Sequence, residues 1–438
     1  MTATAPSTAL LTDHYELTMV EAALRSGAAS RQCVFEVFAR RLPEGRRYGV
    51  VAGTGRLLEA IENFRFSGTE IDQLRRTNVV DEATLEFLAG YRFNGDIWGY
   101  AEGECYFPYS PVLVVESDFA HGVVLETVAL SVLNHDSAVA SAASRMTSAA
   151  GDRPCIEMGS RRTHEEAAVA AARAAYIAGF ATTSNLEAGR RHGVPTAGTA
   201  AHAFTLLHDD EREAFAAQIA SLGKGTTLLV DTYDVTRAVE LAVELAGPEL
   251  GAVRLDSGAL LAQAREVREQ LDRLGATGTK IVVTSDLDEH AIAALAAGPV
   301  DRYGVGTSLV TGSGAPTAGM VYKLVARTDD SGTMVSVAKK SKDKHSVAGR
   351  KYALRRRSAK GVAEAEVIGI GEAPANDGDD RALLVPLVTG GEVVDRDALA
   401  LDAARARHDA SRAELPPAAH RLQRGEPVIP TVFEDAQP

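Results

Sequence analysis

The sequence predicts an α/β protein built around a parallel sheet, either doubly wound or closed into a barrel. From residue 155 to residue 306, short apolar stretches alternate with helical patterns, and strands in such alternating units pair in parallel. A short polar motif follows each of the seven apolar stretches. Residues 1–120 lack this alternation and mix helical and strand patterns, which indicates a separate α+β domain.

The alternating region should contain seven strands and six helices. The expected strands are 155–159, 181–184, 195–199, 226–231, 251–256, 280–285 and 302–306. The expected helices are 163–178, 186–192, 203–222, 235–246, 259–274 and 288–297. Thr163 and Glu166 have the spacing of a capping box, and glycines such as Gly179 and Gly223 stand where helices should end.

The N-terminal domain should begin with a helix. Asp13 can cap this helix, Glu16 stands three residues later, and Gly27 can end it. Residues 33–53 first alternate apolar and polar side chains, as a half-buried strand does, and then pass through an arginine-rich turn. Further helices are expected near 54–63, 69–76 and 81–90, and further strands near 95–104 and 111–116.

Two changes in the pattern of residues along the sequence set the expected domain boundaries. A long Ala/Val/Leu helix over 124–150 opens the second domain, which is expected to span residues 121–330. Residues 331–438 are expected to form C-terminal strands, a basic loop and a tail. The basic loop includes the run KKSKDKHSVAGRK.

The composition excludes several functional classes. A net charge of -13 and a sequence pI near 5.4 argue against general binding to nucleic acids or anionic membranes. The wide spacing of Cys33, Cys105 and Cys155 argues against a disulfide framework or a zinc site. The N-terminus has no signal-peptide pattern, and no apolar stretch approaches the roughly 20 residues that span a bilayer. We therefore expect a cytoplasmic protein that binds neither nucleic acid nor membrane.

The polar motifs after the seven strands define the candidate site. Because the carboxyl ends of parallel strands face one common edge, we expect these motifs to share one site. In chain order they are GSRR (159–162), TSN (183–185), GTAAH (198–202), DTYD (231–234), RLDSG (254–258), TSD (284–286) and GVGTS (304–308).

His202, the last residue of GTAAH, is the candidate nucleophile, since an imidazole nitrogen can accept a phosphoryl group directly. A lone histidine at a helix start is more often a cap or a core residue. Asp231 favours the catalytic interpretation of His202, because it ends the next predicted strand and could hold the other ring nitrogen.

Two other motifs fit a sugar phosphate. In RLDSG, Arg254 can hold a phosphate, and Asp256 can accept hydrogen bonds from a ribose diol or position Mg²⁺. An internal Arg–Asp ion pair is an equally good interpretation of that motif alone. In GVGTS, the glycines allow backbone N–H groups to approach a phosphate, and Thr307 can add a hydroxyl.

Taken together and in order, these segments resemble the nicotinate phosphoribosyltransferase family. The matching pieces are TDHYELTM, FEVFARRLP, EMGSRRTH, AGFATTSN, PTAGTAAHAF, LLVDTYDV, VRLDSG, YGVGTSLVTG, GMVYKLV and AGRKYALRR. They run from residue 12 to about residue 357, and the chain after about residue 370 matches only loosely. The resemblance implies a homodimer with shared active sites and an irregular, TIM-like α/β barrel between an N-terminal α+β domain and a C-terminal segment.

The resemblance also implies an activity. The family joins nicotinate to 5-phosphoribosyl-1-pyrophosphate (PRPP), releasing nicotinate mononucleotide and pyrophosphate in NAD salvage, with Mg²⁺ and coupled ATP hydrolysis. By this resemblance ATP phosphorylates His202, Asp231 orients it, and Asp256 is a third catalytic residue. Phe180 and Tyr15 are implied as aromatic walls around the pyridine ring, with Tyr15 coming from the neighbouring subunit.

Arg161 is implied to meet either the nicotinate carboxylate or the pyrophosphate, and the resemblance does not decide between them. The metal ligands also stay open. The implied substrate-binding residues are Tyr15, Arg161, Phe180, Ser184, Thr199, Arg254, Ser257, Gly304, Gly306 and Thr307.

Three alternatives remain. A nicotinamide or quinolinate phosphoribosyltransferase would run the same chemistry on another ring. Nicotinamide-preferring relatives carry an acidic residue just before the segment corresponding to AGTAAH, and HGVPTAG here has none, which favours nicotinate. A phosphosugar enzyme on a plain TIM barrel would need a catalytic Lys or Glu, and the seven edge motifs contain no lysine. A non-catalytic homologue is disfavoured by the intact His202, Asp231, Arg254 and Asp256.

Overall fold

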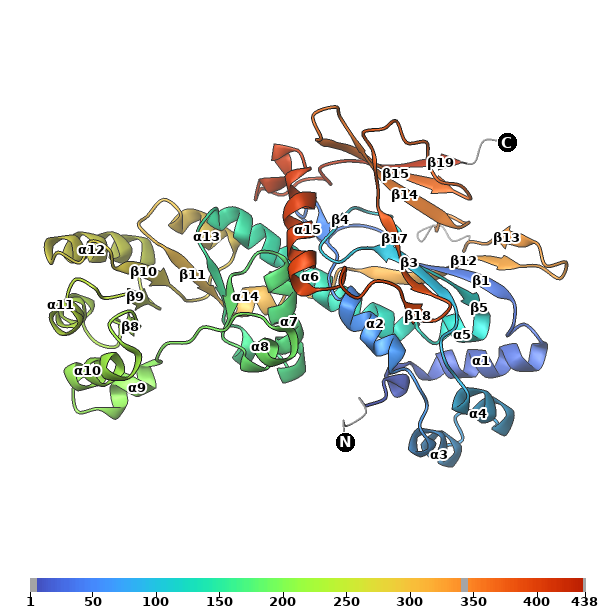
Figure 1. Cartoon of the computed structure of the whole chain (residues 1–438), viewed down its shortest axis with the longest axis horizontal. Coiled ribbons are helices and arrows are strands. Elements are labelled where there is room, and N and C mark those ends of the chain that lie inside the picture. Colours follow the sequence, from blue (N-terminus) through green and yellow to red (C-terminus); the bar gives the residue numbers. More distant parts are fainter. Residues whose placement is uncertain (1–5, 340–345, 436–438) are drawn as a thin grey trace. The chain divides into compact units, whose positions relative to one another are not determined.

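The computed structural model describes residues 6–339 and 346–435, and the chain divides into two compact units (Figure 1). Unit 1 comprises residues 1–138 and 317–438, and unit 2 comprises residues 139–316. This division differs from the three domains expected at 1–120, 121–330 and 331–438, because C-terminal strands pair with N-terminal ones. Part of the expected basic loop, residues 340–345, lies outside the described residues.

Unit 1 is built on a seven-stranded sheet in the order β13-β12-β1-β5-β3-β17-β18. Its strands are β1 (Gln32–Ala39), β3 (Asp96–Tyr100), β5 (Leu113–Asp118), β12 (Met320–Thr328), β13 (Met334–Ser336), β17 (Leu384–Thr389) and β18 (Glu392–Val393). β1 pairs antiparallel with both β5 and β12, and every residue after Gln32 is buried. The expectation of a half-buried strand is therefore wrong: β1 is central, and its Glu36 is neutralised by Lys351 at 2.7 Å.

Smaller sheets and helices complete unit 1. The helices are α1 (His14–Ser26), α2 (Thr54–Glu62), α3 (Gly68–Arg76), α4 (Glu82–Ala89), α5 (Phe119–Val123) and α15 (Leu401–Ala413), with 3-10 turns η1 (Ala9–Leu11) and η3 (Pro417–His420). One small sheet pairs β2 (Gly49–Val50) with β4 (Cys105–Tyr106), and another orders β16 (Arg381–Ala382), β14 (Lys351–Arg357), β15 (Ala363–Ile370) and β19 (Thr431–Asp435).

The first helix is confirmed, but its expected cap is wrong. Gly27 ends α1 with φ 76°, a left-handed conformation that glycine adopts without strain. The Asp13 side chain makes no capping bond to α1. Glu16 is fully buried and accepts hydrogen bonds from Thr127, so a tertiary contact replaces the local cap.

A long helix, α6 (Glu126–Ala150), leads from unit 1 into unit 2. The helical stretch Phe119–Ala150 has the length and hydropathy of a membrane span, which the sequence was not expected to contain. Its most apolar window is 61% buried inside the protein, as in a core helix, so this stretch is weak evidence for a membrane span.

Unit 2 contains the expected parallel sheet, with six strands in the order β7-β6-β11-β10-β9-β8 (Figure 1). The strands are β6 (Cys155–Glu157), β7 (Thr182–Thr183), β8 (Thr227–Leu229), β9 (Ala252–Leu255), β10 (Lys280–Val283) and β11 (Arg302–Val305). The helices are α7 (Glu165–Ile177), α8 (Leu186–His192), α9 (His202–Leu207), α10 (Glu211–Leu222), α11 (Val235–Ala246), α12 (Leu260–Arg273), α13 (Glu289–Leu295) and α14 (Thr307–Val310), with the turn η2 (Ser160–Arg162).

Three local expectations need correction. The helix expected over 203–222 is two helices, because Asp210 caps a new start by accepting from the Glu213 N–H. His164, and not Thr163, caps α7. The expected strand at 195–199 contributes a single bridge, Thr183 to Thr196.

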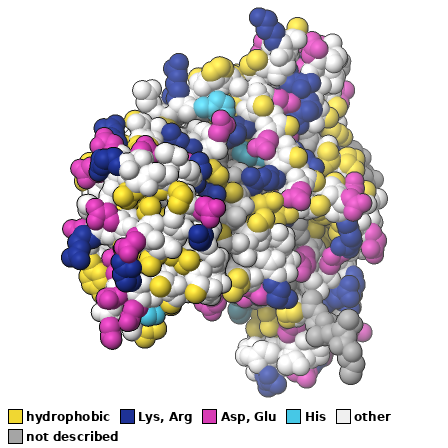
Figure 2. All heavy atoms as spheres, turned by 60° about the vertical axis from the view of Figure 1, so that its left-hand side comes forward, with side chains coloured by type: hydrophobic (Ala, Val, Ile, Leu, Met, Phe, Trp, Pro, Cys, Tyr) yellow, Lys and Arg dark blue, Asp and Glu magenta, His cyan; other side chains and the backbone are white. Residues whose placement is uncertain are grey.

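The missing strand decides the shape of the sheet. Pro195 has no N–H to donate, and the segment pairs with β7 only through the Pro195 carbonyl and the Ala197 N–H. The result is a mixed α/β fold whose parallel sheet curls into half a barrel. On the face shown in Figure 2, acidic and basic side chains are interspersed.

Candidate active site

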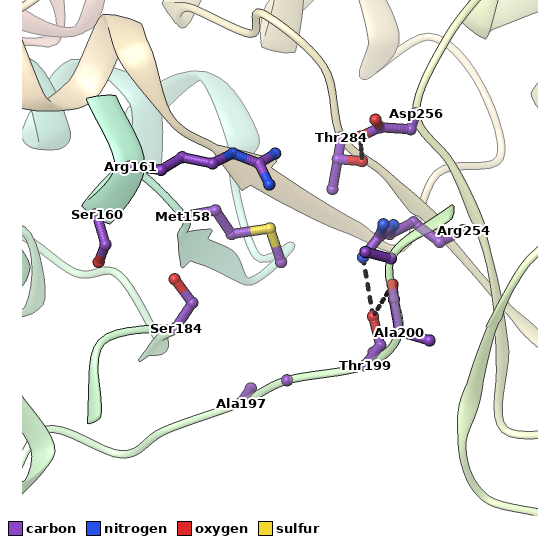
Figure 3. Close-up of a pocket in the computed structure, with 12 residues that line it drawn as sticks. Met158, Ser160, Arg161, Ser184, Ala197, Thr199, Ala200, Arg254, Asp256 and Thr284 are labelled. Atoms are coloured by element: carbon purple, nitrogen blue, oxygen red, sulfur yellow. Dashed lines mark hydrogen bonds between the residues drawn. The ribbon is translucent and has the colours of Figure 1, made fainter. Parts of the chain in front are cut away.

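The polar motifs meet at one edge of the unit 2 sheet, as the sequence predicts. A pocket of about 290 Å³ opens there (Figure 3). It is lined by Met158, Ser160, Arg161, Ser184, Ala197, Gly198, Thr199, Ala200, Ala201, Arg254, Asp256 and Thr284. The pocket therefore draws on the ends of β6, β7, β9 and β10 and on the loop before α9.

Two arginines reach into this pocket from different sides. Arg161 extends from η2, Arg254 extends from β9, and the Met158 thioether lies between them (Figure 3). Arg254 donates to the Thr199 hydroxyl at 2.8 Å, which ties the loop to the sheet. Its buried Nε has no hydrogen-bond partner in the part of the chain that the structure describes. Burial lowers the pKa of Arg254, and the carboxylates of Asp256 and Asp231 do not outweigh that effect.

A second pocket of about 170 Å³ adjoins the first, sharing Met158, Arg161, Asp256 and Thr284. Its further lining residues are Arg162, Ser285, Asp286, Gly304, Gly306 and Thr307. A Cβ on Gly304 would lie 2.4 Å from Thr284 Cγ2, so glycine is required where these strands approach. Ser285 has φ 140°, a strained conformation for a residue with a side chain.

His202 begins α9 beside this edge, and its predicted partner is not the observed one. The His202 Nδ1 lies 3.1 Å from the Thr232 hydroxyl, and Nε2 lies 3.9 Å from Asp256 Oδ2. The side chain is 39% exposed, so its ring is open to a co-substrate. Thr232, the neighbour of Asp231, takes the place at the ring that the sequence assigned to Asp231.

Asp231 instead organises the turn after β9. Its Oδ2 accepts from the Asp256 N–H at 2.8 Å and from the Ser257 hydroxyl at 2.9 Å. Its Oδ1 is buried and has no hydrogen-bond partner among the described residues. Asp256 in turn accepts from the Thr284 hydroxyl. The predicted residues Asp231, Asp256 and Ser257 thus form one connected cluster.

The two predicted aromatic walls behave differently. Phe180 is 1% exposed and packs in the interior of unit 2, so its ring is not presented to a ligand in this structure. Tyr15 lies in unit 1 on α1, where it is 46% exposed, and burial raises the pKa of its hydroxyl to about 12.

Met158, Thr232 and Thr284 are among the site residues that sequence reasoning missed. Each belongs to a quoted motif, EMGSRRTH, DTYD or TSD, in which a charged residue one or two positions away drew the attention. Its position could have pointed to Met158, which directly follows the last residue of β6, Glu157, and precedes the turn that carries Arg161.

A pocket at the carboxyl edge of a parallel sheet, with two arginines and a glycine-rich turn, is typical of α/β proteins that bind phosphorylated small molecules. Residues 10–134 match the family described as the nicotinate phosphoribosyltransferase (NAPRTase) N-terminal domain. The chain is 60% identical over 431 residues to nicotinate phosphoribosyltransferase pncB1 of Mycobacterium tuberculosis, covering 96% of this chain and 94% of that one. The chain belongs to the nicotinate phosphoribosyltransferase family.

More distant relatives agree with this membership. The nicotinate phosphoribosyltransferase of Bacillus subtilis is 37% identical, over 80% of this chain and 73% of that one. The crystal structure of human nicotinic acid phosphoribosyltransferase superposes with a TM-score of 0.82 at 26% identity, covering 97% of each chain. A nicotinate-nucleotide pyrophosphorylase from Pyrococcus furiosus shares the fold, with a TM-score of 0.77 at 24% identity over 94% of this chain and 98% of that one.

Proposed function

We propose that this chain joins nicotinate to PRPP and releases nicotinate mononucleotide and pyrophosphate, a step of NAD salvage. The observation that carries the proposal is the convergence of Arg161 and Arg254 on one pocket with the Met158 thioether between them (Figure 3). Two cations suit a substrate pair that brings a carboxylate and several phosphate oxygens. The apolar Met158 suits the face of a pyridine ring.

The chemistry needs positioning more than acid–base catalysis. The pyridine nitrogen attacks C1 of the ribose while the bond from C1 to the pyrophosphate oxygen breaks. That nitrogen carries no proton to lose, so no general base is required. The protein's task is to align the ring nitrogen with C1 and to stabilise the charge on the departing pyrophosphate.

The two adjoining pockets divide the substrates between them. Gly304, Gly306 and Thr307 line the smaller pocket, where backbone groups can approach the 5′-phosphate. Arg254, Asp256 and Ser257 serve the ribose and its phosphate. Arg161 and Ser184 meet the ring side of the larger pocket, with Arg161 placed to bind the nicotinate carboxylate.

ATP couples to this reaction through His202. A ring nitrogen attacks the γ-phosphorus of ATP, an N–P bond forms, and the bond to the ADP oxygen breaks; water later hydrolyses the phosphohistidine. The exposure of the ring and its contacts with Thr232 and Asp256 support this role. Thr232 holds Nδ1, which leaves Nε2 on the side of Asp256.

Mg²⁺ fits the acidic cluster at this edge. The buried Asp231 Oδ1, which lacks a hydrogen-bond partner among the described residues, and the Asp256 carboxylate are oxygen donors of the kind that Mg²⁺ binds. The described residues contain no group of three metal-binding side chains, so phosphate oxygens and water would complete the shell. Bound there, the ion would offset negative charge on the pyrophosphate.

A homodimer with shared sites, working in the cytoplasm, completes the proposal. Leu206 and Leu207 are 61% and 77% exposed just after His202, as expected of side chains that a second subunit covers. Tyr15 of the second subunit would then close the side of the pocket that receives the pyridine ring.

Mixing two variants that each lack ATP-stimulated synthesis tests the shared site. Tyr15→Ala and His202→Ala subunits, unfolded and refolded together, should recover roughly a quarter of the wild-type ATP-stimulated activity, because half of the dimers carry one intact site. The same mixture made from separately refolded subunits is the control. Recovery no greater than that control would place Tyr15 and His202 in one chain or outside a common site.

Substrate choice is tested by turnover of nicotinate, nicotinamide and quinolinate, each with and without ATP. We expect product from nicotinate, with ATP raising the rate. ATP-independent use of nicotinamide or quinolinate in preference to nicotinate would overturn the proposal. Acid-labile protein phosphate after incubation with labelled ATP would test the coupling step separately.

A further inference from the structure

A buried carboxylate lies close to the pocket residues Ser160, Arg161 and Ser184. It takes no part in the proposed transfer reaction. Glu157 is the last residue of β6 and is fully buried. Its Oε1 accepts from the Gly159 N–H at 2.5 Å, and its Oε2 accepts from the Thr183 hydroxyl of β7. Both of these hydrogen-bond donors are neutral, and burial raises the pKa of this carboxyl.

These contacts belong to a closed ring of hydrogen bonds. The Asn185 N–H donates to Thr183 Oγ1 at 2.9 Å, and the Thr183 hydroxyl donates onward to Glu157. The Asn185 side-chain amide donates to the Ser160 hydroxyl at 3.0 Å. The ring closes through the backbone, because Gly159, which is covalently joined to Ser160, donates its N–H to Glu157 Oε1. We call this set of Glu157, Gly159, Ser160, Thr183 and Asn185 the β6–β7 ring.

The β6–β7 ring encloses residues that line the pocket. Ser160 is a member, Arg161 follows it, and Ser184 stands between Thr183 and Asn185. The Ser184 N–H also donates to the Glu157 carbonyl at 2.8 Å. Arg254 and Asp256, on the opposite side of the pocket, are not members.

The turn fixed by the ring has little room to adjust. A Cβ on Gly159 would lie 2.2 Å from Val310 Cγ1, 3.0 Å from Glu157 Oε1 and 3.1 Å from the Gly306 carbonyl. The Met158 N–H donates to the Val305 carbonyl at 2.8 Å, which fixes the same turn to β11. Displacing the Glu157 carboxylate would therefore move the turn that carries Arg161.

We infer that Glu157 is a positioning residue for nicotinate binding: through the β6–β7 ring it holds Arg161 and Ser184 in the geometry that receives the ring substrate. The inference rests on the proposed function. A misplacement of a binding group by about 1 Å is enough to weaken a productive complex strongly. Because Ser160 and Ser184 line only the larger pocket, whereas Arg161 lines both, loss of the β6–β7 ring should raise KM for nicotinate much more than KM for PRPP.

Three variants and one control test the inference by steady-state kinetics with each substrate varied in turn. Glu157→Ala and Thr183→Val break the ring and should raise KM for nicotinate about tenfold, with KM for PRPP within about twofold of wild type. Glu157→Gln can still accept from the Gly159 N–H and donate to Thr183 Oγ1, so its KM for nicotinate should stay within about threefold. Thr182→Val is the control, because the Thr182 hydroxyl has no partner in the described part of the chain.

The outcomes separate cleanly. A parallel rise in both KM values, or a lowered melting temperature with both KM values unchanged, would reduce Glu157 to a structural role and overturn the inference. So would a Glu157→Gln variant as impaired as Glu157→Ala, since that result would make charge the decisive property. If Glu157→Ala does not fold, Thr183→Val and Glu157→Gln still decide. Wild-type protein that fails to use nicotinate would refute the proposed function itself.

Discussion

Arg355 in unit 1 and Arg254 in unit 2 are both largely withdrawn from water, yet their surroundings have opposite effects. Burial acts to lower the pKa of Arg355, but the carboxylates of Glu366 and Glu104 outweigh it, and the pKa is raised. Burial lowers the pKa of Arg254, and neighbouring aspartates do not compensate. Arg355 contacts Glu366 at 3.0 Å, whereas the hydrogen-bond partner of Arg254 is the Thr199 hydroxyl.

The difference separates a structural charge from a binding charge. An arginine whose carboxylates are already in place stabilises the fold and has little left to offer a ligand. Both guanidinium groups have a buried Nε without a partner among the described residues, so the contrast lies in the carboxylates. An arginine held by a neutral hydroxyl keeps most of its attraction for an incoming anion. Substitutions at the two positions should therefore change different quantities.

The largest effect is expected at the catalytic edge itself. His202→Ala should abolish phosphoenzyme formation and ATP stimulation, leaving weak ATP-independent synthesis, because the phosphoryl acceptor is gone. Labelled γ-phosphate on the protein and rates with and without ATP measure the two effects. Phosphoenzyme still formed by the variant would assign the acceptor elsewhere. His208→Ala is a matched control, since that histidine bonds only to the local Phe204 carbonyl in the described contacts.

The next largest effect is expected on stability in unit 1. Arg355→Met removes the cation among Glu366, Glu104 and Glu414 and should cost about 3–5 kcal/mol, the usual penalty for leaving buried charges unpaired. Urea unfolding measures the loss. Arg75→Met in α3 is the control: Arg75 and both of its carboxylate partners are at least 45% exposed, so these ion pairs should contribute little to stability. Equal losses for the two variants would contradict the comparison.

Glu16 is a third kind of buried charge, held only by neutral donors. It accepts from the Thr127 N–H at 2.9 Å and from the Thr127 hydroxyl at 2.6 Å. Burial raises its pKa to about 7, and the nearby carboxylates of Glu126 and Asp13 add to the shift. The folded state thus retains this proton at a pH where the unfolded chain, with a pKa of about 4.3, has lost it.

The sign of the pH effect follows from that retained proton. Below about pH 4 both states are protonated, and the stability from this group is fully present; it falls as pH rises towards 7. The folded pKa of about 7 and the unfolded pKa of about 4.3, at about 1.4 kcal/mol per pKa unit, limit the loss to about 4 kcal/mol. From pH 5 to pH 8, the free energy of unfolding should fall less for the Glu16→Gln variant than for the wild-type protein. Glu36, whose pKa burial also raises to about 7, is common to both proteins and cancels. Parallel pH profiles would show that Glu16 titrates normally.

Periodicity and parallel-sheet geometry were enough to predict most of unit 2. Apolar period and helix-ending glycines place elements to within a few residues because those signals are local, and the shared edge follows from parallel pairing. The closed barrel did not follow, because Pro195 lacks the donor that a ladder needs. The join between N- and C-terminal strands, such as β1 with β12, is a non-local pairing that no sequence window contains.

The site was predicted as a set of motifs and less well as a set of contacts. Arg161, Ser184, Thr199, Arg254 and Asp256 all line the predicted pocket. The ring partner of His202 differs by one residue, Thr232 in place of Asp231, because adjacent side chains at a strand end point to opposite faces. Phe180 is buried in unit 2, since an apolar side chain after a helix-ending glycine suits a core as well as a pocket, and its place beside the pyridine ring stays a prediction.

The smallest effect is expected from a substitution of Arg254. It is the most direct test of the comparison between Arg254 and Arg355. Arg254→Gln should raise KM for PRPP about 30-fold, or about 2 kcal/mol, the usual value of a hydrogen bond to a charged group. Its unfolding free energy should be unchanged or higher, because a partly buried cation without a carboxylate contact is removed. A variant that loses stability and keeps its KM would make Arg254 a structural charge like Arg355, and the lowered pKa of its guanidinium would then have no functional meaning.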